Sequence, residues 1–166
     1  MFSGSVTRMR SGIETIPISE MGDHILEAAA HARASDVHIE PKEGRTVVRF
    51  RVDGELRDVY ALKSETSLQV VSRFKALADL DVAERRRPQD GAMDAVIDGR
   101  AYIIRLATTS TPHGESLVMR LLEPWAKPKS LGELGMSERQ VEDMVGFARR
   151  NQGMVLVAGP TGSGKT

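Results

Sequence analysis

The strongest constraint on the fold lies at residues 154–166, which read MVLVAGPTGSGKT. Their first five residues are apolar and predict a buried strand over 154–158. Residues 159–166 then match the pattern G-x-x-x-x-G-K-[ST] at every position. In such a loop, glycines let successive backbone N–H groups converge on phosphate oxygens. The stretch therefore predicts a phosphate-binding loop that leads from a strand into a helix.

The motif also assigns roles to single residues. Lys165 is expected to reach the β and γ phosphates of ATP, and the Thr166 hydroxyl is expected to hold Mg²⁺. An ordinary glycine-rich turn is the alternative, but the apolar run directly before the loop favours the nucleotide site. The predicted nucleotide-binding residues are Gly159, Pro160, Thr161, Gly162, Ser163, Gly164, Lys165 and Thr166.

Composition narrows the classes of function that remain. The chain has 166 residues, no cysteine, and 23 Lys and Arg against 23 Asp and Glu, for a formal net charge of zero. The lack of cysteine excludes disulfides and thiolate metal sites, and a zero net charge gives no overall attraction to nucleic acid. No apolar run approaches the roughly 20 residues that cross a bilayer. These features predict a cytoplasmic protein that does not insert into a membrane.

Hydrophobic periodicity predicts a mixed α+β domain over residues 19–123. Helix spacing covers roughly 20–33 and 65–79, with Ser64 or Thr66 as the expected N-cap of the second helix. Alternation with a period of two follows the first helix in SDVHIEP and in TVVRFRVDGELRDVY, whose DG predicts a hairpin turn. Three more strand-like runs follow the second helix: AMDAVI, AYIIRLATTS and ESLVMRLLE.

The flanking segments differ from this domain in composition. Residues 1–18 show no sustained period and are expected to form a flexible arm. Residues 124–136 contain two prolines and two glycines within PWAKPKSLGELG and predict a linker. Ser137 and Gln140 have the spacing of a capping box, which predicts a helix from Glu138 to about Arg150. Residues 137–166 therefore begin a second domain.

Several stretches together resemble a known family. SDVHIEP, VVRFRVDGELRDV, RRRPQDG, LGELGM and GPTGSGKT, in this order and spacing, resemble the type II secretion and type IV pilus assembly ATPases, the secretion superfamily ATPases. The resemblance runs from about residue 25 to residue 166. It implies a PAS-like α+β domain joined by a linker to a RecA-like α/β ATPase domain, which would begin at residue 137.

The resemblance also carries expectations about function. It implies a homo-hexameric cytoplasmic ATPase, peripheral at the inner membrane through secretion or pilus platform proteins, that uses Mg-ATP hydrolysis to power secretion or pilus assembly. The 166 residues are then expected to be an N-terminal part that is inactive by itself. A non-enzymatic docking or regulatory module is the alternative for the isolated chain.

Arginines form the second candidate site. The resemblance implies that arginines of the α+β domain act on the γ-phosphate, and Arg51, Arg57 and Arg73 lie in stretches that match the family's arginine positions. A solvated or salt-bridged sheet face is the alternative for any single arginine. The wider candidate group is Arg49, Arg51, Arg57, Arg73, Arg105 and Arg120.

A short basic run and one histidine are predicted to have structural roles. The run ERRRPQDG at residues 84–91 could contact nucleic acid, but it is short, flanked by acidic residues and free of aromatics. A loop at a subunit interface is the preferred interpretation, and no nucleic-acid partner is expected. His38 shares a strand face with Asp36 and Glu40, and a hydrogen-bonded structural histidine is preferred to a metal ligand.

Overall fold

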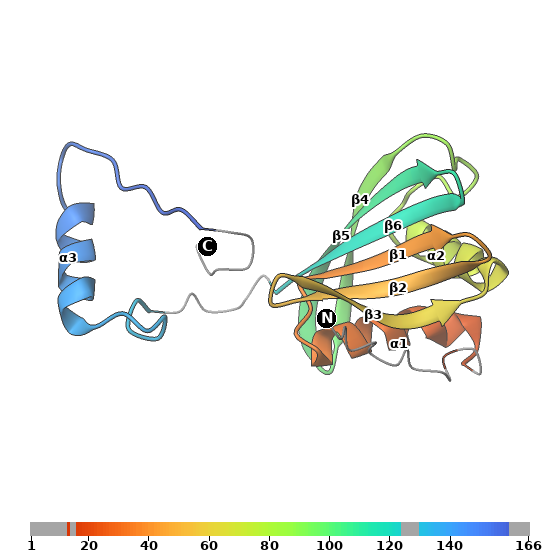
Figure 1. Cartoon of the computed structure of the whole chain (residues 1–166), viewed down its shortest axis with the longest axis horizontal. Helices are drawn as coiled ribbons and strands as arrows, with labels where there is room; N and C mark the ends of the chain where they lie inside the picture. Colours follow the sequence, from red (N-terminus) through yellow and green to blue (C-terminus); the bar gives the residue numbers. More distant parts are fainter. Residues whose placement is uncertain (1–12, 14–15, 124–129, 160–166) are drawn as a thin grey trace, which may run out of the picture. The chain divides into compact units, whose positions relative to one another are not determined.

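The computed structural model describes residues 13, 16–123 and 130–159 (Figure 1). The chain divides into two compact units, Met1–Pro124 and Trp125–Thr166. The larger unit contains both helices and a sheet, which confirms the predicted mixed α+β class. The predicted arm falls largely outside the described residues, although Ile13 within it is only 3% exposed.

The larger unit is built on one six-stranded antiparallel sheet, with strands in the order β3-β2-β1-β6-β5-β4. Two helices lie against one face of this sheet (Figure 1). The elements are α1 (Ile18–His31), β1 (Asp36–Lys42), β2 (Arg45–Val52), β3 (Glu55–Leu62), α2 (Ser64–Leu77), β4 (Gln89–Ile97), β5 (Arg100–Thr111) and β6 (Gly114–Leu122).

The core lies between the helices and the sheet. Val37 and Ile39 of β1 are fully buried, as their alternation with polar residues predicts. Met21 and Ile25 stand four residues apart on α1 and are buried against the same core. Consequently the other face of the sheet, opposite α1 and α2, carries the polar members of each alternating strand. This face is called the open face below.

Two tight turns fix the hairpins. Asp53 and Gly54 both have positive φ, at 52° and 84°, between β2 and β3. Asp98 and Gly99 repeat this geometry with φ of 49° and 73° between β4 and β5. Positive φ at both central residues suits the twist of two-residue hairpins, and Asp-Gly tolerates it well. The hairpin predicted at the first DG is confirmed.

The start of α2 differs from the expectation. Its N-cap is Lys63, and no side chain accepts a capping hydrogen bond, so the prediction of Ser64 or Thr66 as N-cap was wrong. The reason is that β3 continues to Leu62, which leaves a single extended residue before the helix. Strand β4 also begins earlier than AMDAVI, because Gln89 already pairs with Thr108 of the long strand β5.

The smaller unit contains one helix, α3 (Glu138–Ala148), which ends slightly before the predicted Arg150. The predicted capping box is confirmed, because the Ser137 N–H donates to Gln140 Oε1 at 2.8 Å and the Gln140 N–H donates to Ser137 Oγ. The strand predicted at 154–158 was wrong. These residues have no strand conformation, since no neighbouring strand among the described residues supplies ladder hydrogen bonds.

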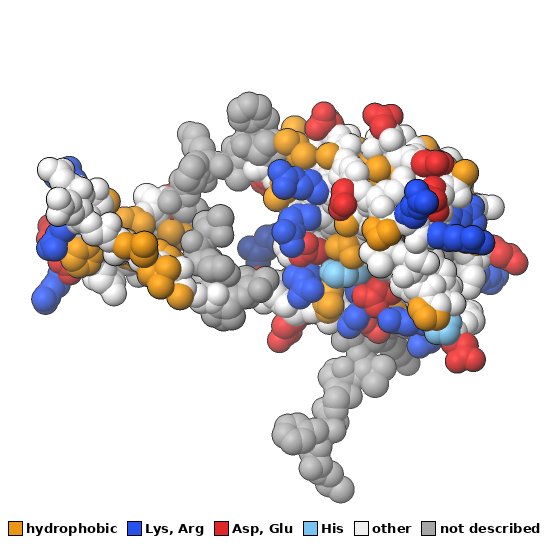
Figure 2. Space-filling model, turned by 90° about the horizontal axis from the view of Figure 1, so that it is seen from above, with side chains coloured by type: hydrophobic (Ala, Val, Ile, Leu, Met, Phe, Trp, Pro, Cys, Tyr) orange, Lys and Arg blue, Asp and Glu red, His pale blue; other side chains and the backbone are white. Residues whose placement is uncertain are grey.

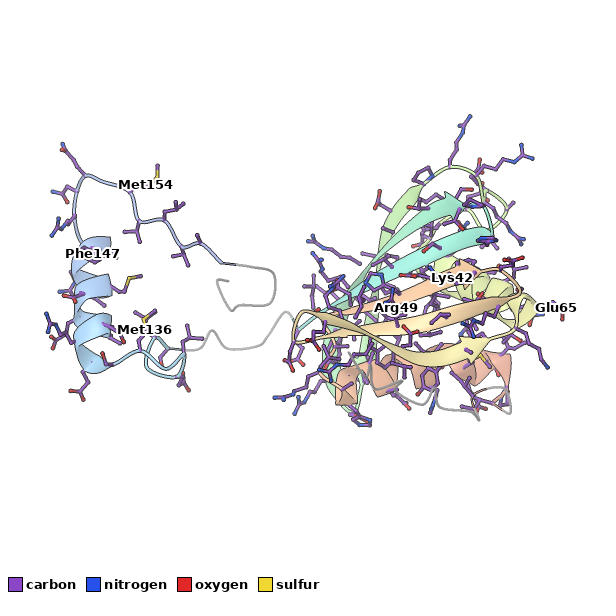
Figure 3. All side chains as sticks on the ribbon, in the orientation of Figure 1. Lys42, Arg49, Glu65, Met136, Phe147 and Met154 are labelled. Atoms are coloured by element: carbon purple, nitrogen blue, oxygen red, sulfur yellow. The ribbon has the colours of Figure 1, made fainter. Side chains whose placement is uncertain are left out.

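The apolar side chains of the smaller unit are exposed as a result. Met154 is 89% exposed and Leu156 is 83% exposed. Figure 2 shows hydrophobic side chains gathered on the surface of this unit. Phe147 of α3 and Met154 are labelled in Figure 3. An apolar surface of this kind is typical of a segment that packs against further protein.

Candidate functional site

Most of the predicted phosphate loop lies outside the described residues. Gly159 is described and exposed. Pro160, Thr161, Gly162, Ser163, Gly164, Lys165 and Thr166 lie outside the described residues. The chemistry of the donors still suits Mg-ATP, because the loop offers an ammonium group, a threonine hydroxyl and glycine N–H groups.

The open face of the sheet carries a row of charged residues across four neighbouring strands. Asp36 on β1 stands directly opposite Arg51 on β2 and opposite Arg120 on β6. Arg120 in turn stands opposite Arg105 on β5. Directly opposed residues share one face of an antiparallel sheet, so all four side chains lie on the open face. This row of Arg51, Asp36, Arg120 and Arg105 is called the arginine ladder below.

Asp36 organises the ladder. Its Oδ1 accepts a hydrogen bond from Arg120 Nε at 2.9 Å, and its Oδ2 lies 3.4 Å from Arg51 Nε. Ser35 Oγ donates to the same Oδ2 at 2.7 Å. Only 6% of the Asp36 side chain is exposed, so most of this carboxylate is withdrawn from water. The contacts hold two guanidinium groups in fixed directions on either side of one anion.

The ionised form of Asp36 is favoured in the folded protein. Burial alone would raise the pKa of this carboxyl. Hydrogen bonds from Ser35 and Arg120, together with the charges of Arg120 and Arg51, outweigh burial and place the pKa below its ordinary value. Asp36 therefore remains a carboxylate at neutral pH, and the ladder has three positive charges for one negative charge.

A shallow hollow lies beside the arginine ladder, and its charged lining is two arginines and two aspartates. It has a volume of about 220 Å³, and its lining includes Arg105, Arg120, Asp36 and Asp90. The Arg120 side chain is 64% exposed, and Arg105 is also exposed. No carboxylate among the described residues forms an ion pair with Arg105. Two directly opposed guanidinium groups repel each other, so an anion between them would be stabilised.

The three arginines favoured from the sequence are not brought together. Arg51 belongs to the arginine ladder. Arg57 stands opposite the buried Phe50 and so lies on the helix side of the sheet, where it contacts Glu55 at 3.5 Å. Arg73 on α2 reaches Asp23 of α1 at 3.3 Å.

A second charged group continues along the open face. Arg49, labelled in Figure 3, stands opposite His38 in the register of β1 and β2. Its Nε binds Asp58 at 2.9 Å. His38 Nδ1 lies 3.7 Å from Glu40, while the buried Nε2 has no hydrogen-bond partner among the described residues. The prediction of a hydrogen-bonded histidine was wrong, because 3.7 Å is longer than a hydrogen bond and the other ring nitrogen has no partner among the described residues. Burial lowers the pKa of His38 below its ordinary value, so the ring stays neutral.

The described residues offer neither a metal cluster nor a membrane-spanning helix. Within 13, 16–123 and 130–159, no group of three or more His, Asp or Glu side chains could hold a metal ion. No helix among these residues is long and apolar enough to cross a bilayer. Figure 2 shows basic and acidic side chains interleaved on the surface of the larger unit.

Comparisons with known proteins place the chain in a family. The family described as Type II/IV secretion system protein matches residues 13–166. Type II secretion system protein HxcR of Pseudomonas aeruginosa is 45% identical over 161 residues, which cover 97% of this chain and 34% of that protein. Type II secretion system ATPase E of Vibrio cholerae is 44% identical over 150 residues, which cover 90% of this chain and 30% of that protein. Type IV pilus assembly ATPase TfpB of Acinetobacter baylyi is 41% identical over 150 residues, which cover 90% of this chain and 26% of that protein.

A solved structure agrees at the level of the fold. The ATPase DotB of Yersinia pseudotuberculosis superimposes with a TM-score of 0.55 at 15% identity, covering 83% of this chain and 38% of that chain. The chain spans about a third of the length of HxcR. Since the family match extends over residues 13–166, the chain belongs to the Type II/IV secretion system protein family.

Proposed function

We propose that these residues are the N-terminal part of a homo-hexameric cytoplasmic ATPase that powers type II secretion or type IV pilus assembly. The family match and relatives that are named as secretion and pilus ATPases support this proposal. In this scheme the larger unit is a PAS-like domain, and residues 137–166 open a RecA-like domain. Platform proteins at the inner membrane are the proposed partners.

The nucleotide would be held by the loop at 159–166. Lys165 would neutralise the β and γ phosphates, and Thr166 would place its hydroxyl against the metal. Bound Mg²⁺ would supply charge neutralisation at the phosphate oxygens. The exact match of residues 159–166 to the phosphate-loop pattern, within a chain of this family, is the observation that carries the ATPase proposal.

The larger unit would contribute cations when it closes over the nucleotide. Arginines act in phosphoryl transfer by stabilising negative charge that develops on the γ-phosphate. The arginine ladder supplies such groups with Asp36 as their anchor, and Arg105 and Arg120 are its most exposed members. Of the arginines favoured from the sequence, Arg51 belongs to this set. Arg57 and Arg73 lie on the other side of the sheet, where they have acidic partners of their own.

The ATPase proposal is tested with Lys165→Ala in the full-length protein that contains these residues. Hydrolysis of Mg-ATP should fall by about 10²-fold or more, because the transferred phosphoryl group loses a positioned cation. Secretion or pilus assembly should be lost with it. A Lys165→Ala variant that hydrolyses ATP at the wild-type rate would contradict the proposal, and Lys42→Ala, at an exposed strand end, is the matched control.

The isolated 166 residues would act only as a docking or regulatory module. One observation favours this second role: residues 154–158, directly before the phosphate loop in the sequence, are exposed and form no strand. We expect no ATP hydrolysis by the isolated chain. Steady phosphate release from it that survives Lys165→Ala would show that the nucleotide site lies elsewhere.

A further inference from the structure

The loop between α2 and β4 is fixed by its own polar groups. Residues 81–88 of this connection are called the arginine loop. Asp81 Oδ1 accepts hydrogen bonds from the Ala83 and Glu84 N–H groups. Glu84 Oε1 accepts from the Arg86 and Arg87 N–H groups at 2.7 and 3.2 Å. Each of these carboxylates therefore closes one turn of the loop by binding backbone donors.

Gln89 closes the loop at its base. Its Nε2 donates to the carbonyl oxygens of Asp81 and Glu84, both at 3.0 Å. Its Oε1 accepts from the Asp81 N–H at 2.9 Å. One side chain thus joins the two ends of the arginine loop. Because three hydrogen bonds depend on Gln89, its removal should loosen the loop without touching any arginine.

A buried ion pair anchors the loop to the domain. Lys75 Nζ donates to the Glu84 carbonyl oxygen and to Glu115 Oε1, the latter at 2.8 Å. The two side chains are 1% and 4% exposed. A lysine is almost never buried unless it is paired, so this pair fixes α2, β6 and the loop relative to one another.

The arginine side chains donate none of these hydrogen bonds. Arg85, Arg86 and Arg87 are all exposed. Among the residues that the structure describes, none of their guanidinium groups forms an ion pair or a side-chain hydrogen bond. Hydrogen bonds to Glu84 come from the backbone N–H groups of Arg86 and Arg87. The domain therefore holds three adjacent positive charges at a fixed place. After these backbone N–H groups, the charge of Arg87 helps to lower the pKa of Glu84.

We propose that the arginine loop is a docking surface for a short acidic segment of a partner protein. Guanidinium groups bind carboxylates with two parallel hydrogen bonds, and a loop that is already ordered loses little entropy on binding. A long polyanion fits less well, because exposed Asp79 and Asp90 flank the loop and would repel its next phosphates. A membrane fits less well because no large hydrophobic side chain of the loop is exposed.

The test uses the complete chain of 166 residues and a hexaglutamate peptide with blocked ends. The loop variant changes Arg85, Arg86 and Arg87 to Gln. A matched control changes Arg45, Arg139 and Arg149 to Gln, which removes the same charge from exposed positions elsewhere. A third variant, Gln89→Ala, keeps every arginine but loosens the loop. Binding is measured by fluorescence anisotropy at about 0.15 M salt, where charges more than about 8 Å apart are screened.

The loop variant should bind hexaglutamate about tenfold more weakly than the control, as expected for the loss of three exposed ion pairs. Gln89→Ala should bind about threefold more weakly, because the arginines are no longer held in place. Equal affinity of loop and control variants, or no binding by the wild type, would overturn the proposal. Tighter loop-dependent binding of oligo-dT or of phosphatidylserine vesicles than of hexaglutamate would overturn the choice of partner. Nucleotide hydrolysis does not enter this test.

Discussion

Arg120 donates a hydrogen bond from Nε to Oδ1 of Asp36 at 2.9 Å, across the junction of β6 and β1. This junction joins the two halves of the sheet, because β1 to β3 lie on one side of it and β4 to β6 on the other. The Asp36 side chain is almost fully buried, while the Arg120 side chain is 64% exposed. Asp36 thereby fixes the base of an arginine whose tip remains free to meet an anion.

Replacing Asp36 tests this anchoring role. Asp36→Asn keeps the shape of the side chain but removes its charge, so we expect the free energy of unfolding to fall by about 1–3 kcal/mol. Asp58→Asn breaks a more exposed pair with Arg49 and should cost less than about 1 kcal/mol. Urea titration followed by circular dichroism measures both. Equal losses would mean that Asp36 contributes no more than a surface carboxylate.

His38 should make stability depend on pH. Burial and the charges of Arg51 and Arg49 lower the pKa of His38, while Glu40 and Asp36 act in the opposite direction without compensating. The unfolded chain therefore takes up a proton near pH 6.5, where the folded protein does not. Because the unfolded state binds more protons, stability should fall as pH drops from about 6.5 towards the folded pKa.

The measurement compares urea midpoints of the wild type and His38→Gln between about pH 7.5 and pH 5.5. His38→Gln should be less sensitive to pH over this interval, since glutamine does not titrate. His113→Gln, at an exposed turn, should retain the wild-type slope. An unchanged slope in His38→Gln would assign the pH dependence to other groups. Asp36 and Glu40 also have lowered pKa values, and their contributions should be lost only at more acidic pH.

The buried pair of Lys75 and Glu115 provides a double-mutant test. Lys75→Met should cost about 3–5 kcal/mol, because it leaves a buried carboxylate without its partner. The double variant Lys75→Met with Glu115→Leu should recover most of this loss, since apolar side chains of similar volume replace both charges. A double variant as unstable as the sum of the single variants would show that the two charges act independently.

Periodicity in the sequence predicted which residues of each strand share a face. It placed Asp36, His38 and Glu40 together on β1, and the structure confirms this arrangement. The sequence did not predict that Asp36 meets Arg120, because these residues are 84 positions apart and register between distant strands is set by tertiary packing. The family resemblance groups Arg51 with Arg57 and Arg73, but the structure places Arg51 on the open face and gives the other two acidic partners on the helix side.

Predictions from local sequence also failed where contacts with distant residues determine the structure. Lys75 occupies a core position of α2, four residues after the buried Val71. A lysine at such a position is a signal for a buried partner, but Glu115 lies 40 residues away and its pairing follows only from the fold. The apolar run at 154–158 has strand composition, yet strands need neighbours. The described residues supply none.

The role proposed for Arg105 and Arg120 of the ladder at the nucleotide of the full-length protein is tested by removing both side chains. Single-turnover hydrolysis of Mg-ATP should be compared between Arg105→Ala with Arg120→Ala and a control with Arg57→Ala and Arg73→Ala. The ladder variant should be slower by about 10³-fold or more with its nucleotide affinity largely retained, and the control should stay within about tenfold of the wild type. A ladder variant with the wild-type rate would rule out this role of Arg105 and Arg120, as would a control variant that is the slower of the two.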